Sequence, residues 1–164
     1  MQRQPIKLTR PEVRDVFVNE RLMSRLDADL QRGATVWVAA PPGSGKTTLL
    51  SSYVEARQRR CLWYQVDRGD RDLASLFANL ASAACSLAPV SRSALPNLGA
   101  EYATDVEAFA RHFFAAWYQA LPQGTLVVFD DCHNLHLVDQ PQALLEALTA
   151  TRDPQVDLVF LGRQ

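Results

Sequence analysis

Lysine is nearly absent from this chain of 164 residues. It occurs only at positions 7 and 46, although the chain has 17 basic side chains in all. Where a sequence otherwise uses arginine, an isolated lysine indicates a position that needs a compact ammonium group rather than a planar guanidinium.

Cysteine is scarce, and an excess of one charge and long apolar runs are missing. Three cysteines, an odd number, exclude a disulfide framework and fit a reducing compartment. With 17 basic and 18 acidic residues the net charge is −1, so nothing marks the segment itself as a binder of nucleic acid or anionic membranes. No apolar run approaches the ~20 residues of a membrane span, and the polar residues 1–14 do not resemble a signal peptide. We therefore expect a globular, cytoplasmic protein with no membrane part.

The second lysine lies in segment 36–48, where an apolar run is followed by a loop rich in proline and glycine and then by a helical pattern. This order predicts a phosphate-binding loop. Glycines let the backbone curl and turn its N–H groups onto a polyphosphate, which the N-terminus of the next helix also favours. Lys46 would reach the β- and γ-phosphates, and the Thr47 hydroxyl would bind Mg²⁺. The predicted nucleotide contacts are Pro42, Gly43, Ser44, Gly45, Lys46, Thr47 and Thr48.

The loop departs at one position from the pattern G-x-x-x-x-G-K-[ST], because Ala40 stands where the first glycine is expected. An ordinary strand-to-helix turn is the competing interpretation. Such a turn has no need of a lysine, so the phosphate-binding interpretation is favoured.

Two adjacent carboxylates, Asp130 and Asp131, follow a wholly apolar run 84 residues after Lys46. P-loop NTPases hold Mg²⁺ with a carboxylate at this kind of strand end, which is the role expected for Asp130. Asp131 is then the candidate that orients or deprotonates the attacking water. Two acids side by side are costly without a cation, so the pair itself favours a metal.

Arg163, just after the last apolar run, is the candidate sensor of the γ-phosphate, with an ordinary exposed arginine as the alternative. Cys132, His133 and His136 invite a zinc interpretation, but no second cysteine pair accompanies them, so zinc is disfavoured.

The rest of the chain alternates between strand and helix patterns after a polar lead-in, residues 1–18, that we expect to be loop. Residues 19–164 would form the NTPase core, with a solvated basic run at 57–60 and a capping box at 104–107. Strands are expected at 35–39, 61–66, 125–129 and 156–161, helices at 19–33, 46–57, 72–87, 104–121 and 141–150, and a long loop at 88–103. The pattern predicts an open, mainly parallel α/β sheet with helices on both faces.

These segments together resemble the nucleotide-binding (NB-ARC/AAA-like) domain of STAND-class signal-transduction ATPases, and within that class the large ATP-binding LuxR-type transcriptional regulators. The resemblance covers nearly the whole chain and rests on RLMSRL at 21–26, APPGSGKTTLL at 40–50, WYQVDRGD at 63–70 and LVVFDDCH at 126–133. Members of the group also tend to have alanine at the position of Ala40. The sequence departs from them at Cys132, where an aromatic residue is common, and at Gly162, where Ser or Thr usually precedes the sensor arginine.

The resemblance implies a switch that rests with ADP, self-associates with ATP, and is reset by Mg²⁺-dependent hydrolysis. In such proteins DNA is bound by a downstream domain, which these 164 residues do not include. It further implies the strand order 5-1-4-3-2, with the strand at 35–39 left unpaired here if the chain is truncated before its fifth strand. Two alternatives stay open: a P-loop kinase for small molecules, and an interaction module that binds nucleotide without turnover.

Overall fold

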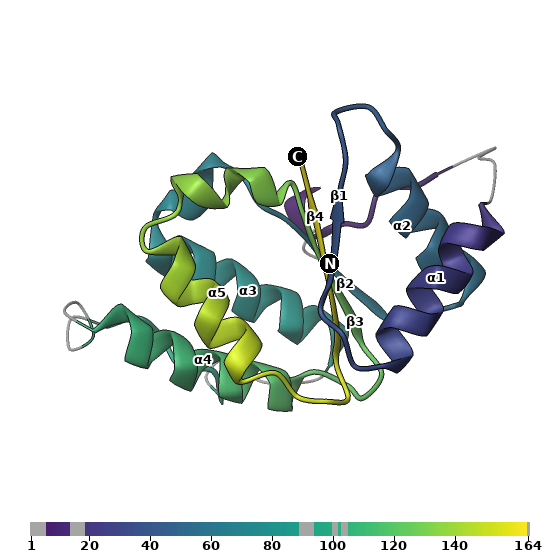
Figure 1. Ribbon diagram of the computed structural model, residues 1–164. Coiled ribbons are helices and arrows are strands. Elements are labelled where there is room, and N and C mark those ends of the chain that lie inside the picture. Colours follow the sequence, from purple (N-terminus) through teal and green to yellow (C-terminus); the bar gives the residue numbers. More distant parts are fainter. Residues whose placement is uncertain (1–5, 14–18, 89–93, 100–101, 103–104, 164) are drawn as a thin grey trace. The chain divides into compact units, whose positions relative to one another are not determined.

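Four parallel strands form one sheet in the computed structural model, which describes residues 6–13, 19–88, 94–99, 102 and 105–163 (Figure 1). Their spatial order is β1-β4-β3-β2, as expected for a P-loop NTPase. Every observed strand lies within one residue of its predicted bounds. The strands are β1 (Val36–Ala39), β2 (Cys61–Gln65), β3 (Leu126–Asp130) and β4 (Asp157–Gly162).

Five α-helices also follow the predicted pattern. They are α1 (Glu20–Gln31), α2 (Lys46–Ala56), α3 (Leu73–Leu87), α4 (Val106–Ala120) and α5 (Pro141–Ala150). Among the described residues, the 3-10 helices η1 (Ile6–Leu8), η2 (Arg68–Arg71) and η5 (Cys132–Leu137) were not predicted, because pieces of three to six residues carry no readable hydrophobic period. None of the described helices is both long and apolar enough to cross a membrane.

The described residues divide into two compact units. The first comprises residues 1–66, 124–133 and 157–164, and the second comprises 67–123 and 134–156. The first unit holds the whole sheet together with η1, α1 and α2, and the second holds η2, α3, α4 and α5.

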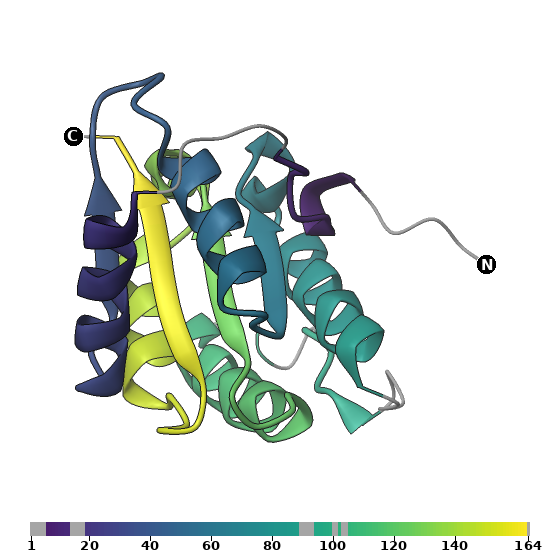
Figure 2. The same ribbon diagram turned by 90° about the vertical axis from the view of Figure 1, so that its right-hand side faces the viewer.

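In the first unit, α1 and α2 cover one face of the sheet (Figure 2). Successive side chains of a strand point to opposite faces, so alternate residues of each strand meet these helices. The core of this face consists of Met23, Leu26 and Leu30 from α1, Leu50, Tyr53 and Val54 from α2, and Trp63, Leu126, Val128, Val159 and Leu161 from the strands.

The opposite face of the sheet carries a row of aromatic rings, one from each strand. Trp37 stacks on Phe160 at 4.4 Å between ring centroids, Phe160 stacks on Phe129 at 5.4 Å, and Tyr64 lies 5.8 Å from Phe129. The register places these residues beside one another in neighbouring strands. The row therefore fixes the alignment of all four strands just before the carboxyl ends of β3 and β4.

The ends of two helices show how each is capped, and the end of α4 corrects a prediction. Asn19 caps α1 by accepting a hydrogen bond from the N–H of Leu22. The helix ends just before Gly33, whose φ of 70° lies in the left-handed region. Asp105 caps α4 by accepting a hydrogen bond from the N–H of Ala108. The capping box predicted at 104–107 had position 104 as the cap, one residue earlier. Position 104 itself lies outside the described residues, as do 89–93, 100–101 and 103 of the predicted long loop.

The lead-in is packed, not loop throughout as expected. Leu8 of η1 is 5% exposed, and Lys7 lies over the ring of Tyr64 on β2, 4.9 Å from its centroid. Arg10 donates to the carbonyl of Ser51 on α2 at 2.8 Å. This segment has no hydrophobic period, because single contacts hold it in place and it buries no continuous face. Residues 14–18 lie outside the described part of the chain.

The basic run at 57–60 is also more than a solvated helix end. Arg57 pairs with Glu20 at 2.6 Å and with Asp27 at 2.9 Å. Arg59 pairs with Asp157 at 2.6 Å, at the start of β4. The ion pairs of Arg57 link the end of α2 to α1, and the ion pair of Arg59 links the segment after α2 to the sheet.

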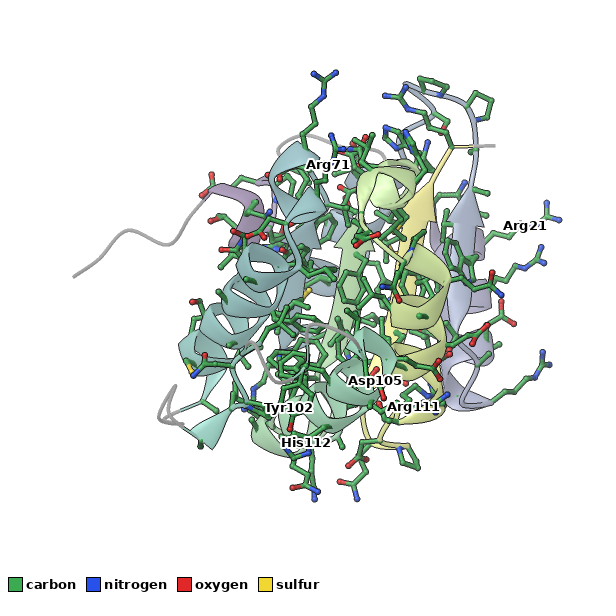
Figure 3. All side chains as sticks on the ribbon, turned by 90° about the vertical axis from the view of Figure 1, so that its left-hand side faces the viewer. Arg21, Arg71, Tyr102, Asp105, Arg111 and His112 are labelled. Carbon is green, nitrogen blue, oxygen red and sulfur yellow. The ribbon has the colours of Figure 1, made fainter. Side chains whose placement is uncertain are left out.

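The second unit has an aromatic core to which α4 contributes. Phe109, Phe113 and Trp117 are fully buried, and the Trp117 indole N–H donates to the carbonyl of Leu80 on α3 at 2.8 Å. Arg111 lies at the surface of the same helix (Figure 3). It pairs with Glu107 at 2.9 Å.

Candidate functional site

The loop between β1 and α2 depends on two glycines in the left-handed region. Gly43 has a φ of 75° and Gly45, the N-cap of α2, a φ of 83°. An added Cβ would meet no atom within 4 Å at either position, so the backbone conformation and not space is what requires glycine. No side-chain hydrogen bond caps α2, so no side chain occupies the N–H groups of its first turn.

Lys46 holds the loop in its curled form. Its ammonium Nζ donates to the carbonyl oxygens of Ala40 at 2.8 Å and Pro41 at 3.0 Å, and to the Ser44 hydroxyl at 3.3 Å. These acceptors come from the start and the middle of the loop. The charged end of Lys46 therefore lies where an incoming anion can replace neutral acceptors.

The Thr47 hydroxyl meets the predicted metal-binding carboxylate directly. Its Oγ1 donates to Oδ2 of Asp130 at 3.0 Å, across 83 positions of sequence. Parallel strands end at the same edge of the sheet, which brings the last residue of β3 to the loop that follows β1. Asp130 is only 5% exposed. Burial raises the pKa of its carboxyl above the ordinary value, although the Asp131 N–H, the Thr47 hydroxyl and the charge of Lys46 favour the ionised form.

The chain leaves β3 at Asp131, which has a φ of 56°. This left-handed conformation is rare for a residue with a side chain. The Gln65 amide on β2 donates to its Oδ2 at 2.9 Å. On the other side, Nδ1 of His133 lies 3.7 Å from its Oδ1. The Asp131 side chain remains 38% exposed, so it is open to solvent at the pocket.

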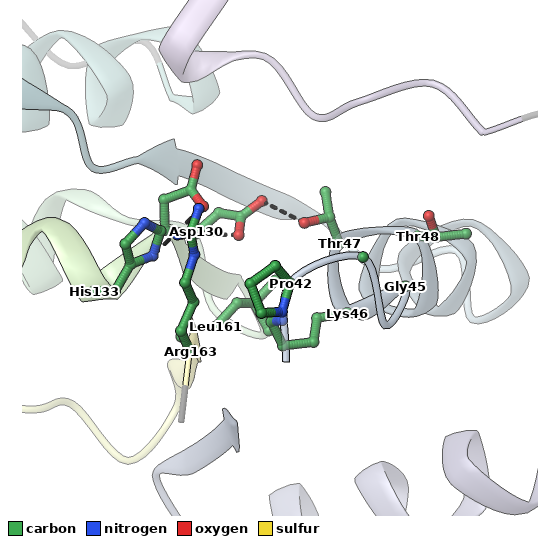
Figure 4. A pocket seen from close by; sticks show the side chains of 12 residues that line it. Pro42, Gly45, Lys46, Thr47, Thr48, Asp130, His133, Leu161 and Arg163 are labelled. Atoms are coloured by element: carbon green, nitrogen blue, oxygen red, sulfur yellow. Dashed lines mark hydrogen bonds and ion pairs between the residues drawn. The ribbon is translucent and has the colours of Figure 1, made fainter. Parts of the chain in front are cut away.

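Most of these residues line one pocket of about 310 Å³ in the first unit (Figure 4). That volume is at the lower end of ligand-binding sites. Of the predicted site residues only Ser44 is not in its lining, and Ser44 still accepts from Lys46. The lining residues are Pro42, Gly43, Gly45, Lys46, Thr47, Thr48, Asp130, Asp131, His133, Leu161, Gly162 and Arg163.

A second recess of about 400 Å³ also borders the loop. It shares Gly45, Lys46 and Thr48 with the first pocket, and its other lining residues come from the start of α1, from β1, from the loop and from α2. The recess is chiefly apolar, in contrast to the charged first pocket.

Gln65 and His133 join the site although the sequence did not single them out for it. Gln65 is the last residue of a strand, and His133 was considered only as a zinc ligand. The strand order places β2 next to β3, which brings Gln65 beside Asp131. Cys132 is not among the residues that line the pocket: its thiol donates to the carbonyl of Phe129 at 3.1 Å, and burial raises its pKa to about 12. That thiol is not disposed to bind a metal.

A parallel sheet with this strand order and a glycine loop leading into α2 define a P-loop NTPase domain. Residues 29–164 match the family model of the AAA domain, and the chain belongs to that family. A chain in a structure of Drosophila ORC bound to AT-rich DNA and Cdc6 is similar in fold, with a TM-score of 0.55 and 16% identity. The match covers 88% of this chain and 46% of that chain, so this chain spans less than half of its length. No curated protein matches the sequence.

Proposed function

We propose that the chain binds ATP with Mg²⁺ and hydrolyses it slowly, as the switch domain of a STAND-class transcriptional regulator similar to the large ATP-binding LuxR type. The observation that carries the nucleotide part is the 3.0 Å hydrogen bond between Thr47 and Asp130, beside a glycine loop that bears Lys46. AAA domains bind nucleotide and often oligomerise. The regulatory part rests on the resemblance of the sequence alone.

In this proposal the loop binds the polyphosphate. The Lys46 ammonium exchanges its carbonyl acceptors for oxygens of the β- and γ-phosphates, a stronger, charge-assisted interaction. N–H groups of Gly43, Ser44 and Gly45, and of Thr48 in the first turn of α2, complete the cradle. Pro42 borders the pocket at the outer side of the loop.

Thr47 and Asp130 would hold Mg²⁺. A hydroxyl and a carboxylate are hard oxygen ligands of the kind Mg²⁺ prefers, and they already lie within hydrogen-bonding distance. The buried carboxyl of Asp130, with its raised pKa, also fits a cation that would favour its ionised form. When bound, the metal would neutralise negative charge on the phosphates.

Asp131 is the proposed base. It accepts a proton from a water molecule as the water oxygen forms a bond to the γ-phosphorus and the bond to the bridging oxygen of ADP breaks, which leaves ADP and phosphate. Arg163 lines the same pocket and would contact the γ-phosphate oxygens.

The apolar recess beside the loop suits a nucleobase, because it is continuous with the residues that would hold the α-phosphate side of the nucleotide. Adenine is taken from the resemblance. The same resemblance supplies the proposed partners: further copies of the protein in the ATP state, and DNA through a downstream domain.

The test compares nucleotide affinity and phosphate release for matched variants. We expect Lys46→Ala to weaken Mg·ATP binding about 100-fold or more in calorimetry, since charge-assisted hydrogen bonds contribute ~1.5–3 kcal/mol each. Lys7→Ala, the same change at the other lysine, should leave the affinity unaltered because that side chain lies over Tyr64. Equal affinities in the two variants would contradict the site.

Asp131→Asn separates turnover from binding. It should retain ATP affinity and lose most phosphate release. Phosphate release unaltered by this change would contradict the role of Asp131. Binding by the unmodified chain without any release would favour the interaction module, and transfer to an added acceptor would favour the kinase.

A further inference from the structure

The Asp131 carboxylate lies between two side chains that come from different segments. Gln65, at the end of β2, donates to Oδ2 at 2.9 Å, and His133, in η5, approaches Oδ1 with Nδ1 at 3.7 Å. Figure 4 shows the His133 ring on the same side of the pocket as Asp130 and Arg163.

A half-exposed carboxylate at a turn needs such contacts to keep one orientation. Asp131 has left β3 with a left-handed backbone, so the strand no longer fixes the direction of its side chain. A single hydrogen bond would still allow the carboxylate to rotate about it, whereas contacts at both oxygens fix its plane. The lone pairs that these contacts leave free can still accept a proton.

The distance from His133 is too long for a direct hydrogen bond and short enough to become one after a shift of a few tenths of an ångström. Catalytic hydrogen bonds are often long before substrate binds and shorten in the reacting complex. The His133 side chain is 23% exposed and lines the same pocket as Asp131.

We propose that His133 is a positioning residue that, opposite Gln65, holds the Asp131 carboxylate in the orientation in which it meets the attacking water. This inference rests on the proposed function, because it assigns His133 a part in the hydrolysis step. His133 itself accepts no proton and binds no phosphate in that step; it donates from Nδ1 to Asp131.

The experiment measures steady-state phosphate release with Mg·ATP for His133→Ala, His133→Asn and His136→Ala. We expect His133→Ala to lower kcat about 10- to 100-fold with KM for ATP within about twofold, since misplaced catalytic groups cost up to ~100-fold without loss of substrate binding. His133→Asn, whose amide nitrogen can occupy the place of Nδ1, should recover part of kcat. His136→Ala, an exposed histidine of the same 3-10 helix, is the matched control and should behave as the unmodified chain.

A double variant identifies the route of the effect. In an Asp131→Asn background, His133→Ala should lower kcat no further, because the group that it positions has gone. Thermal unfolding of each variant shows whether it is folded.

The outcomes separate the two proposals. If the unmodified chain binds ATP and releases no phosphate, hydrolysis is contradicted and this inference falls with it. If it releases phosphate while His133→Ala matches His136→Ala, or if His133→Ala has the same effect in the Asp131→Asn background, the positioning role alone is overturned.

Discussion

Asp130 is buried and ionisable, and its burial opposes the ionisation of its carboxyl. Burial raises the pKa of its carboxyl, so the folded protein keeps the carboxyl protonated to a higher pH than the unfolded chain does. Stability from a raised pKa is fully present below the ordinary value of 3.8 and is lost as pH rises through the folded pKa. At neutral pH the ionised carboxylate therefore costs stability that a cation would restore.

We predict that Asp130→Asn raises the melting temperature of the nucleotide-free protein at pH 7, and that the gain shrinks as pH falls toward 4. Added Mg·ATP should stabilise the unmodified chain more than the variant. Asp139→Asn, at an exposed position with the same change of charge, should alter neither quantity. A variant less stable than the unmodified chain at pH 7 would mean that the bonds from Thr47 and the Asp131 N–H outweigh burial.

At this scale the sequence identified the side chains whose spacing along the chain is itself the signal. Lys46 and Thr47 are recognisable because a glycine loop needs them next to it, and Asp130 because it ends an apolar run. Gln65 and His133 have no such pattern. Their contacts with Asp131 depend on which strands are neighbours, and hydrophobic periodicity does not report that.

At the scale of elements, α1 and α2 are joined by a polar cluster beside the core of the first unit. Asp27 accepts from the Tyr53 hydroxyl at 2.8 Å and from Nε of Arg57 at 3.0 Å. Burial acts to raise the pKa of Asp27, yet these hydrogen bonds hold it below its ordinary value. Burial and the bond to Asp27 raise the pKa of Tyr53 to about 12.

We predict that Asp27→Asn lowers the free energy of unfolding by about 1 kcal/mol at pH 7, a value that allows for solvent screening of a partly exposed carboxylate. Because the folded pKa is depressed, this stability is present above 3.8 and is lost as pH falls through the folded pKa. Urea titrations at two pH values measure it. Asp29→Asn on the same helix is the control, since its contacts with Arg25 and Arg32 are longer, at 3.9 and 3.6 Å. Equal losses in both variants would contradict the role of the cluster.

The strands and α-helices could be predicted closely because each buries a face and so repeats with a period of two or 3.6 residues. The packing of the lead-in and the ion pair of Arg59 could not be predicted. Leu8 is one buried residue in a polar segment, and Arg59 pairs with Asp157 across 98 positions. A long-range contact of one residue leaves no trace in local composition.

At the scale of the whole molecule, strand order came from the resemblance and not from periodicity. The observed order agrees with the part of it that four strands can show. Among the described strands, β1 pairs with β4 alone, so its other edge has no partner in the described sheet. Whether a fifth strand covers that edge in a longer protein stays a prediction.

The free edge of β1 carries an apolar groove. Trp37 is 53% exposed and Leu22 of α1 is 41% exposed, and both line a recess of about 260 Å³ together with Arg25, Asp29 and Leu49. Open strand edges with exposed apolar side chains favour pairing between molecules. We therefore expect this chain to self-associate at high concentration without nucleotide, in addition to any association that ATP induces.

Trp37→Lys tests this expectation, because a charged side chain on an edge strand opposes pairing between edges. Light scattering against concentration should show weaker association without nucleotide, at a cost of about 1 kcal/mol in stability from the lost stacking on Phe160. Gln31→Lys adds the same charge at an exposed site on α1, outside that strand, and should leave association unaltered. Equal association in the two variants would show that net charge governs it, and a decrease seen only with ATP would place the nucleotide-induced contact at β1.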